Sequence, residues 1–471
     1  MPRSDNGPKP YPTIIGGGPA GFHAAVQISE LGFRCRILDE SHGLGGVIYR
    51  APGSLRIEER LDAKTRAKVA SYRALFERHR ERIDFESGAE VLGPVDGPRT
   101  LGVLAAGRFA SRTYDRLIVC TGCFERAQPF PGWTLPGVMT LGALQVLAKQ
   151  SGVLACRSAI LAGTGPLLLV AAVQLHRAGI DVQGVFESGR RIDLLRRFTA
   201  LTRGLDLLIE GASCLAYLAR AGVPVRYGWG IVEARGDGEL REAVVAPYDR
   251  QWRPRLGRAK TFTVDGLGVE YGFVSRSQLT QLLGVAHEED EESGWYPISD
   301  AWGRTSDEHI YVAGDGVGVD GAQVAEVQGR LAALACLQDA GAITTEEAQS
   351  LSTPLLRIMR QRQAFRRAFF DFSRRRPGLL ELPRPTTLIC RCEAVRRQDI
   401  DAAIDEGVED LTTLKMVTRV GMGDCQAKMC GSFCADYLRY RTGRQEVGRF
   451  APRFPLSPLP FEALIHKGAD S

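Results

Sequence analysis

The chain has 471 residues, which is enough for two or three domains with hydrophobic cores of their own. Its hydrophobic fraction of 44% and charged fraction of 24% are ordinary for a globular protein, and a formal net charge of +5 is too small to indicate nucleic-acid binding. No apolar run reaches transmembrane length and no secretory signal peptide is evident, so we expect a cytoplasmic protein. Eleven cysteines without an export signal do not suit disulfides.

Residues 13–40, TIIGGGPAGFHAAVQISELGFRCRILDE, predict a buried strand, a glycine turn, a helix and a second strand that ends in acidic residues. Gly16, Gly18 and Gly21 match G-x-G-x-x-G. The first glycine allows the tight turn, the second lets the backbone approach a pyrophosphate, and the third lets the helix pack close to the strand. Free amides at the helix start then face the phosphates. This stretch predicts dinucleotide binding.

Further residues are expected around the same cofactor. Asp39 ends the second strand, where a carboxylate can accept hydrogen bonds from ribose hydroxyls, and Glu40 competes for that role. In YVAGDG, Asp315 follows a strand and precedes a helix, so it can hold a ribityl hydroxyl of a flavin, although an ordinary helix N-cap is the alternative. Combined with the N-terminal unit, this favours FAD, and the expected contacts also include Pro19, Ala20, Gly45, Gly46, Thr121, Gly122, Gly314 and Gln323.

A second unit of the same type begins at Ser158, in SAILAGTGPLLLVAAVQLHRAGIDVQGVFES. Gly163 and Gly165 match the pattern, but Leu168 stands at the third glycine position, where it would push helix and strand apart or crowd a pyrophosphate. Glu187 ends the following strand. Two interpretations stay open: a Rossmann-like half that binds no nicotinamide, and a working NAD(P) site.

A basic, aromatic helix is expected from Leu355 to Arg376. Such a helix can contact anionic lipid. We favour a connector that packs on one apolar face and leaves its arginines in solvent, and the residues of that face would be Ile358, Phe365, Phe369 and Phe372.

The cysteines near the C-terminus form C-x-C at Cys390 and Cys392 and C-x4-C at Cys425 and Cys430. Four thiolates in two local pairs suit a [2Fe-2S] cluster in which each iron is held by one pair. The intervening VRRQDIDAAIDEG predicts a helix, and the glycine turn in GMGDC offers amides to the cluster sulfurs. Structural zinc is the competing interpretation, but zinc ribbons usually use C-x2-C pairs. Cys434 is expected to be a core thiol.

Cys120 and Cys123 form C-x-x-C, which raises the possibility of a disulfide reductase. However, Cys120 belongs to an apolar strand and Cys123 follows its turn, whereas a reactive thiol commonly opens a helix that lowers its pKa. We therefore expect two unpaired thiols. His23 is expected to be a packing or surface histidine.

Together these signals predict an α/β flavoprotein with two dinucleotide-binding (Rossmann-like) domains and a small α-helical C-terminal [2Fe-2S] domain. The expected division is a discontinuous FAD-binding domain (11–125 and 262–345), a degenerate NAD(P)-type domain (126–261), a basic helical connector (346–385), a BFD-like [2Fe-2S] domain (386–446) and a tail (447–471).

From end to end the chain carries a series of motifs: IIGGGPAG, LGGVIYR, FPGWTLPGVM, YGWGIVEA, APYD-x-x-WRP, YVAGDG, CRCE and LTTLKMVTRVGMGDCQAKMC. In these motifs it resembles the B subunits of bacterial hydrogen cyanide synthase. The wider group contains opine oxidase A subunits and the α subunits of heteromeric hydroxyproline, proline and sarcosine-type dehydrogenases. The glycine turns and cysteine pairs are common to that group, whereas FPGWTLPGVM and the YGWGIVEA–APYD block point to the cyanide synthase branch.

This resemblance implies an enzyme that oxidises glycine in two two-electron steps to cyanide and carbon dioxide. The partners would be an amino-acid-oxidase-like C subunit with its own FAD and a ferredoxin-like A subunit, and the complex would attach the chain to the cytoplasmic face of the inner membrane. The chain itself shows no substrate site, because no arginine clamp with an adjacent base is evident. It would pass electrons from the partner's flavin through FAD and a [2Fe-2S] centre to an acceptor, either the respiratory chain or an artificial one.

Four alternatives stay open. The complex could oxidise an opine, proline or hydroxyproline; the chain could be a stand-alone NAD(P)H-dependent flavin reductase; it could be a non-catalytic interaction or redox-sensing protein; or another adenine nucleotide could replace FAD.

Overall fold

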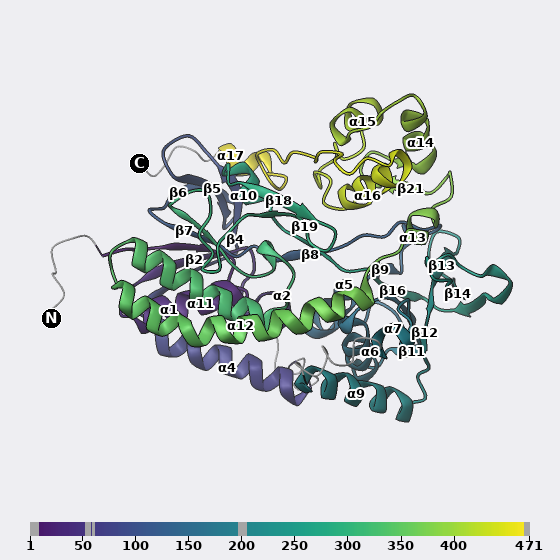
Figure 1. Cartoon of the computed structure of the whole chain (residues 1–471), viewed down its shortest axis with the longest axis horizontal. Coiled ribbons are helices and arrows are strands. Elements are labelled where there is room, and N and C mark those ends of the chain that lie inside the picture. The colour runs from purple at the N-terminus through teal and green to yellow at the C-terminus, as the bar shows by residue number, and fades with distance from the viewer. Residues whose placement is uncertain (1–8, 52–57, 59–61, 196–204, 466–471) are drawn as a thin grey trace.

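The computed structural model describes residues 9–51, 58, 62–195 and 205–465, and the chain forms two α/β units and a small helical C-terminal unit (Figure 1). The first unit is built on a five-stranded parallel sheet in the order β20-β7-β1-β2-β3. Its strands are β1 (Thr13–Ile15), β2 (Cys35–Asp39), β3 (Ile83–Ser87), β7 (Leu117–Val119) and β20 (Ile310–Val312). The strand, turn, helix and strand expected for residues 13–40 are confirmed.

Helices α1 (Pro19–Glu30) and α11 (Ala322–Asp339) pack against each other beside this sheet. A Cβ atom on Gly329 would lie 1.9 Å from the carbonyl oxygen of Ala20, so glycine is required where the two helices meet. Asp62 is the N-cap residue of helix α4 (Ala63–His79), and its carboxylate accepts the Thr65 amide. The antiparallel strands β4 (Ala89–Pro94), β5 (Thr100–Ala105) and β6 (Arg108–Thr113) complete the unit.

The second unit has a parallel sheet in the order β12-β11-β10-β16-β9. Its strands are β9 (Val138–Thr140), β10 (Ser158–Gly163), β11 (Asp181–Glu187), β12 (Val225–Tyr227) and β16 (Gly266–Glu270). Its helices are α5 (Leu141–Val146), which continues as a π-helical turn (Leu147–Ser151), α6 (Pro166–Ala178), α7 (Arg191–Leu195) and α9 (Leu205–Arg220). An antiparallel meander of β13 (Trp229–Arg235), β14 (Glu242–Pro247) and β15 (Lys260–Thr263) packs beside it.

One expected boundary is wrong. The sequence places the return to the first domain at residue 262, but β15 pairs with β14, and β16 lies between β10 and β9 in the second sheet. The physical reason is that β16 pairs with strands that are distant in the sequence, and the local sequence pattern does not reveal such partners. The return therefore follows β16, where β17 (Phe273–Ser275) pairs with β8 (Cys123–Glu125). The hairpin β18 (His287–Asp290) and β19 (Gly294–Pro297) and the short helix α10 (Gln278–Leu282) follow.

Helix α12 (Thr345–Ser373) begins with a capping box at Thr344 and crosses from the first unit to the second (Figure 1). The packed-connector interpretation fits: Phe365 and Phe372 are buried, and Phe369 is half-buried. Ile358, however, is 44% exposed, and Met359 instead lies in the core between α12 and α11. Consecutive helical residues point about 100° apart, so the apolar face passes through Met359 and not through its neighbour.

The arginines of α12 only partly follow the connector hypothesis, which expected them in solvent: Arg357, Arg360 and Arg367 are exposed, whereas others are paired. Arg362 pairs with Asp206, Arg366 with Glu292, and Arg374, just after the helix, with Glu291. Within the described ranges, no helix is long and apolar enough to cross a membrane.

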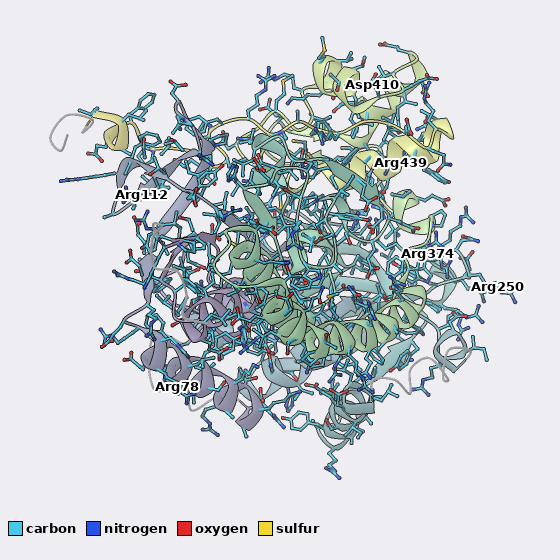
Figure 2. The ribbon with its side chains drawn as sticks, turned by 60° about the vertical axis from the view of Figure 1, so that its left-hand side comes forward. Arg78, Arg112, Arg250, Arg374, Asp410 and Arg439 are labelled. Atoms are coloured by element: carbon cyan, nitrogen blue, oxygen red, sulfur yellow. The ribbon has the colours of Figure 1, made fainter. Side chains whose placement is uncertain are left out.

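The C-terminal unit packs around its own core. It contains α13 (Gly378–Glu381), β21 (Leu388–Cys390), β22 (Val395–Arg396), α14 (Arg397–Asp405), α15 (Leu411–Thr418) and α16 (Gly431–Thr442). Figure 2 shows Arg439 in this unit and Arg374 below it; the two side chains pair with Glu289 and Glu291 of the β18–β19 hairpin region. The segment after α16 returns to the first unit, where the Leu456 amide donates to Leu92 O (2.9 Å), and then ends in the short helix α17 (Phe461–Ile465).

Candidate cofactor sites

The first glycine turn leaves space at one glycine only. A Cβ atom on Gly16 would lie 2.3 Å from Cys120 O, and one on Gly21 would lie 1.8 Å from Gly16 O, so both positions require glycine. At Gly18 the nearest atom would be Gly46 Cα, 3.8 Å away. The turn is therefore packed tightly on the protein side and open at Gly18, which is the arrangement a phosphate needs.

A second glycine pair lies against this turn. The Gly45 amide donates to Gly17 O (2.8 Å), and a Cβ atom on Gly46 would come within 2.9 Å of Gly18 Cα. Both glycines have positive φ, and Gly46 begins the short helix α2 (Gly46–Tyr49). The structure thus brings together Gly45, Gly46 and the first turn, as the sequence predicted.

The two candidate acids, Asp39 and Glu40, have different hydrogen-bond partners. The buried Asp39 carboxylate accepts the amides of Gly17 and Ser41, and burial raises its pKa. Glu40 instead forms a bidentate pair with Arg276 (2.9 and 3.0 Å), and this hydrogen bonding lowers its pKa. Asp39 is therefore the acid beside the glycine turn.

The expected residues from the other strands also meet at this edge of the sheet. Asp315 opens a 3₁₀ turn (Asp315–Val317) after β20, and its Oδ1 accepts the amide of Gly321, the N-cap residue of α11 (3.0 Å). A Cβ atom on Gly316 would lie 3.4 Å from Thr121 Oγ1. Asp315 is thus not itself the N-cap of α11. Gln323 is exposed in the first turn of that helix.

The C-x-x-C cysteines are unpaired. Burial raises the pKa of Cys120 to about 12, and burial together with Asp315 raises the pKa of Cys123 well above its ordinary value. Cys123 Sγ lies 3.7 Å from Asp315 Oδ2. Thiols held in the protonated form do not suit disulfide reduction, so these observations favour two unpaired thiols.

The four C-terminal cysteines converge from two loops. Cys390 is buried at the end of β21, Cys392 is exposed, and Cys430 is the N-cap residue of α16. The thiols interact across the two motifs: a hydrogen bond with Cys430, followed by burial, raises the pKa of Cys390, and burial together with Cys425 raises that of Cys392. These contacts run crosswise and not only within the local pairs.

Backbone groups surround these thiols. The amides of Gly421 and Glu393 hydrogen-bond to Cys390, and the amide of Cys425 to Cys392. A Cβ atom on Gly423 would lie 2.1 Å from Cys392 Cβ, which explains a glycine in the GMGDC turn. Across the described part of the chain, no group of His, Cys, Asp or Glu has the arrangement of a single-ion site. Soft donors with amides directed at them fit an iron–sulfur cluster.

The second glycine turn carries its own acid. Both oxygens of the buried Glu187 accept backbone amides, from Gly165 (3.1 Å) and Gly189 (2.7 Å), and burial raises its pKa to about 7. Leu168 is fully buried in the core between α6 and the sheet. Of the two expected effects of Leu168, the structure therefore shows a side chain placed between helix and strand and not one that crowds the turn.

Sequence analysis missed two residues that link the sites. Lys428, in the cysteine loop, lies close enough to Arg276 and Glu40 for their charges to affect its pKa, which burial and Arg276 lower. The backbone carbonyl oxygen of Arg276 in turn accepts a hydrogen bond from the Thr121 hydroxyl (2.6 Å). Arg276 lies in no motif, and Lys428 lies between Cys425 and Cys430 without being one of the motif cysteines, so the sequence alone does not indicate their contact.

Two family models match the chain. Residues 13–329 match pyridine nucleotide-disulphide oxidoreductase, and residues 388–439 match the BFD-like [2Fe-2S] binding domain. Hydrogen cyanide synthase subunit HcnB of Pseudomonas aeruginosa is 41% identical over 461 residues, which cover 98% of this chain and 99% of the relative. The chain belongs to the HcnB family of hydrogen cyanide synthase subunits. Its cofactors are FAD and a [2Fe-2S] cluster.

Other members of the wider group are more distant. The A subunit of opine oxidase from Agrobacterium tumefaciens is 31% identical, over 96% of this chain and 91% of the relative. Among solved structures, L-proline dehydrogenase from P. horikoshii superimposes with a TM-score of 0.68 at 18% identity and covers 96% of this chain and 79% of that chain. The HcnB-family chain therefore shares its overall fold with that dehydrogenase.

Proposed function

We propose that this HcnB-family chain is the FAD and [2Fe-2S] electron-transfer subunit of a heteromeric complex that oxidises glycine to hydrogen cyanide and carbon dioxide. The observation that carries the proposal is the 41% identity to a hydrogen cyanide synthase subunit over nearly the whole of both chains. The reaction removes two electron pairs and their protons from glycine, first from the C–N bond and then from the resulting imine. An acceptor must take up those electrons, and this chain holds the groups that deliver them.

The oxidation itself belongs to a partner subunit in this proposal. The relatives are named as subunits of a hydrogen cyanide synthase and of an opine oxidase, so they are parts of multi-subunit enzymes. The partners that we propose are an amino-acid-oxidase-like C subunit with FAD and a ferredoxin-like A subunit. Glycine would bind to the C subunit.

We assign the FAD site to the first glycine turn. Gly18 is open for the pyrophosphate, and Asp39 lies beside it for the ribose hydroxyls. Asp315 and the Thr121–Gly122 turn lie at the same sheet edge, where the ribityl chain would follow. The remaining assigned contacts are Gly16, Pro19, Ala20, Gly21, Gly45, Gly46, Gly314 and Gln323.

We assign the cluster to Cys390, Cys392, Cys425 and Cys430. When bound, a flavin takes up electrons in pairs, and an iron–sulfur cluster passes them on singly. The cysteine loop lies against the first unit through Lys428, whose charge acts on Glu40 and Arg276 beside the glycine turn. The proximity of the cysteine loop to the first glycine turn supports an electron-transfer role for the chain.

An opine, proline or hydroxyproline oxidase remains the second candidate, because an opine oxidase chain aligns over 96% of this one. The experiment is to co-express the chain with its neighbouring reading frames and isolate the complex. Cyanide release is then assayed over a panel of glycine, proline, hydroxyproline and opines. Glycine alone should yield cyanide. Reduction of the complex by an opine or proline without cyanide would assign the chain to the second candidate.

We also propose that the chain reaches the cytoplasmic face of the inner membrane only through its partners. Expressed alone, it should remain in the supernatant after ultracentrifugation, and with its partners it should sediment with membranes. Sedimentation of the chain alone with membranes would assign the attachment to this chain itself.

A further inference from the structure

The two glycine turns of this chain are built on the same topology, so each serves as a reference for the other. In the first unit, Gly16 lies between Asp39 on β2 and Cys120, which follows β7. In the second, Gly163 pairs with Glu187 on β11 and with Glu270 on β16. The acids Asp39 and Glu187 therefore correspond, and Glu270 stands where the first turn has Cys120.

An acid ends the second strand of both units. Asp39 accepts the Gly17 amide, whereas Glu187 accepts the amide of Gly165, the glycine that corresponds to Gly18. A carboxylate at this position is compatible with a bound dinucleotide, because it is where a ribose hydroxyl is held. Another feature must therefore explain why the first glycine turn has space for a pyrophosphate and the second does not.

That feature is the side chain of Glu270. A Cβ atom on Gly165 would lie 3.3 Å from Glu270 Oε1, whereas at the corresponding Gly18 the nearest atom is the backbone Gly46 Cα at 3.8 Å. The space through which a pyrophosphate approaches the middle glycine is thus occupied by a carboxyl group. Glu270 is 2% exposed, and its Oε2 has no hydrogen-bond partner among the described residues.

The charges around Glu270 add to this effect. Glu125 and Glu187 face it, and Arg366 of α12 is the cation that acts on it. The Arg366 guanidinium is already engaged by Val319 O (2.9 Å) and Glu292 (2.7 Å). The pyrophosphate of a dinucleotide would therefore lie beside three carboxyl groups, those of Glu125, Glu187 and Glu270.

Helix α12 covers the other side of the turn. A Cβ atom on Gly189, whose amide binds Glu187, would lie 2.6 Å from the Phe372 ring. Phe372 is 5% exposed. The loop after β11, which holds the ribose of a dinucleotide in a working unit, is therefore covered by an aromatic ring of the same chain.

We propose that Glu270 takes the place of the pyrophosphate at the second glycine turn and, together with Phe372, closes this half of the molecule to NAD(P)H. Glu270 is then the residue that confines dinucleotide binding to the first turn. As a consequence, reducing equivalents enter the chain from its partner and not from the nicotinamide pool.

The first test measures NADH and NADPH binding to the FAD-loaded chain by calorimetry, and flavin bleaching by anaerobic mixing. The wild type should show no saturable binding and no rapid bleaching. The double variant Glu270→Ala Phe372→Ala should bind at least one of the two at least tenfold more tightly than the wild type. Glu270→Gln with Phe372→Ala should gain nothing, because glutamine fills the same space. FAD content and the thermal midpoint show that each variant is folded.

The reciprocal test does not need a gain of binding. Cys120→Glu places the same side chain at the first turn and should abolish FAD retention, whereas Cys120→Ser should retain FAD. Saturable NAD(P)H binding to the wild type would overturn the proposal, as would a Glu270→Gln variant that binds as well as the alanine variant. FAD retention by a folded Cys120→Glu chain would contradict it independently.

Discussion

At Gly18 the absence of a side chain leaves space for the pyrophosphate of FAD. The neighbours of Gly18 in the turn, Gly16 and Gly21, are glycines because backbone atoms lie within 2.3 Å of any Cβ, whereas Gly18 faces free space. Gly18→Val should therefore abolish FAD retention, because a branched side chain would fill the pyrophosphate position while the fold is kept. The measurement is flavin absorbance released from the purified chain by heat.

The control for this prediction is Gly211→Ala on α9, where a Cβ atom meets nothing within 4 Å. That variant should bind FAD as the wild type does. Full FAD content in a folded Gly18→Val chain would show that the phosphate lies elsewhere.

His23 couples the stability of the first unit to pH. It lies buried in α1 with its Nδ1 3.0 Å from Pro19 O, and burial lowers its pKa from 6.5 to about 4. Between those values the unfolded chain binds a proton that the folded chain does not. The stability is therefore fully present above pH 6.5 and falls as the pH drops towards 4.

The loss should amount to at most about 3 kcal/mol, at 1.36 kcal/mol per pKa unit. By about pH 5 the loss should be about 2 kcal/mol. Thermal midpoints of FAD release at about pH 7.5 and about pH 5 report this decrease, and it should be smaller in His23→Gln. An identical decrease in the two proteins would exclude His23 as the source.

At the scale of single elements, α15 leads directly into the cysteine loop. Asp410, labelled in Figure 2, caps this helix: its Oδ1 accepts the amides of Thr412 and Thr413 at 2.9 Å. Asp410→Ala should destabilise the C-terminal unit by about 1 kcal/mol and speed cluster loss on heating. Asp410→Asn should retain most of the capping, and cluster absorbance during a thermal ramp compares the variants.

Glu406→Ala, at an exposed acid of the same unit, controls for the change in charge. If it speeds cluster loss as much as Asp410→Ala, charge and not capping explains the effect.

Elements with local signals could be predicted from the sequence, and those that depend on pairing could not. The unit from β1 to β2 is predictable because turn glycines, helix and acid are contiguous, and the cysteine motifs stand out by spacing alone. The placement of β16 is not, since its partners β10 and β9 lie more than a hundred residues upstream. The packed face of α12 is displaced by one residue at Met359, because the periodicity of a helix with many arginines leaves its orientation open.

The same limit applies to the site. The glycines, Asp39 and Asp315 are readable from motifs, whereas Arg276, Lys428 and Glu270 acquire meaning only from what the fold places beside them. Glu270 in particular ends an ordinary apolar strand, and only its register with Gly163 shows that it faces a glycine turn.

In the whole molecule, a buried charge cluster fixes the C-terminal unit to the rest. Asp436 on α16 lies between Arg126 (3.4 Å) and Arg375 (2.7 Å); burial alone would raise its pKa, but the two guanidinium groups hold it below its ordinary value. Trp133 Nε1 also donates to Leu388 O (2.7 Å), next to the strand end that carries Cys390. These contacts hold the C-terminal unit at one position against the second unit and the connector, and electron transfer between two fixed cofactors requires such a fixed position.

The central claim is that electrons from glycine pass through this chain's cluster. The most direct measurement adds glycine anaerobically to the purified complex and follows the paramagnetic signal of the reduced cluster together with cyanide release. The account predicts that the signal appears with cyanide in the wild type and in Cys434→Ser, where a buried core thiol is changed. In Cys425→Ser the signal should be absent and steady-state turnover should fall by roughly tenfold or more, because a hard ligand replaces a soft one, while FAD stays bound. A wild-type cluster that stays oxidised while cyanide forms at full rate, or a Cys425→Ser complex that turns over unchanged, would contradict the account.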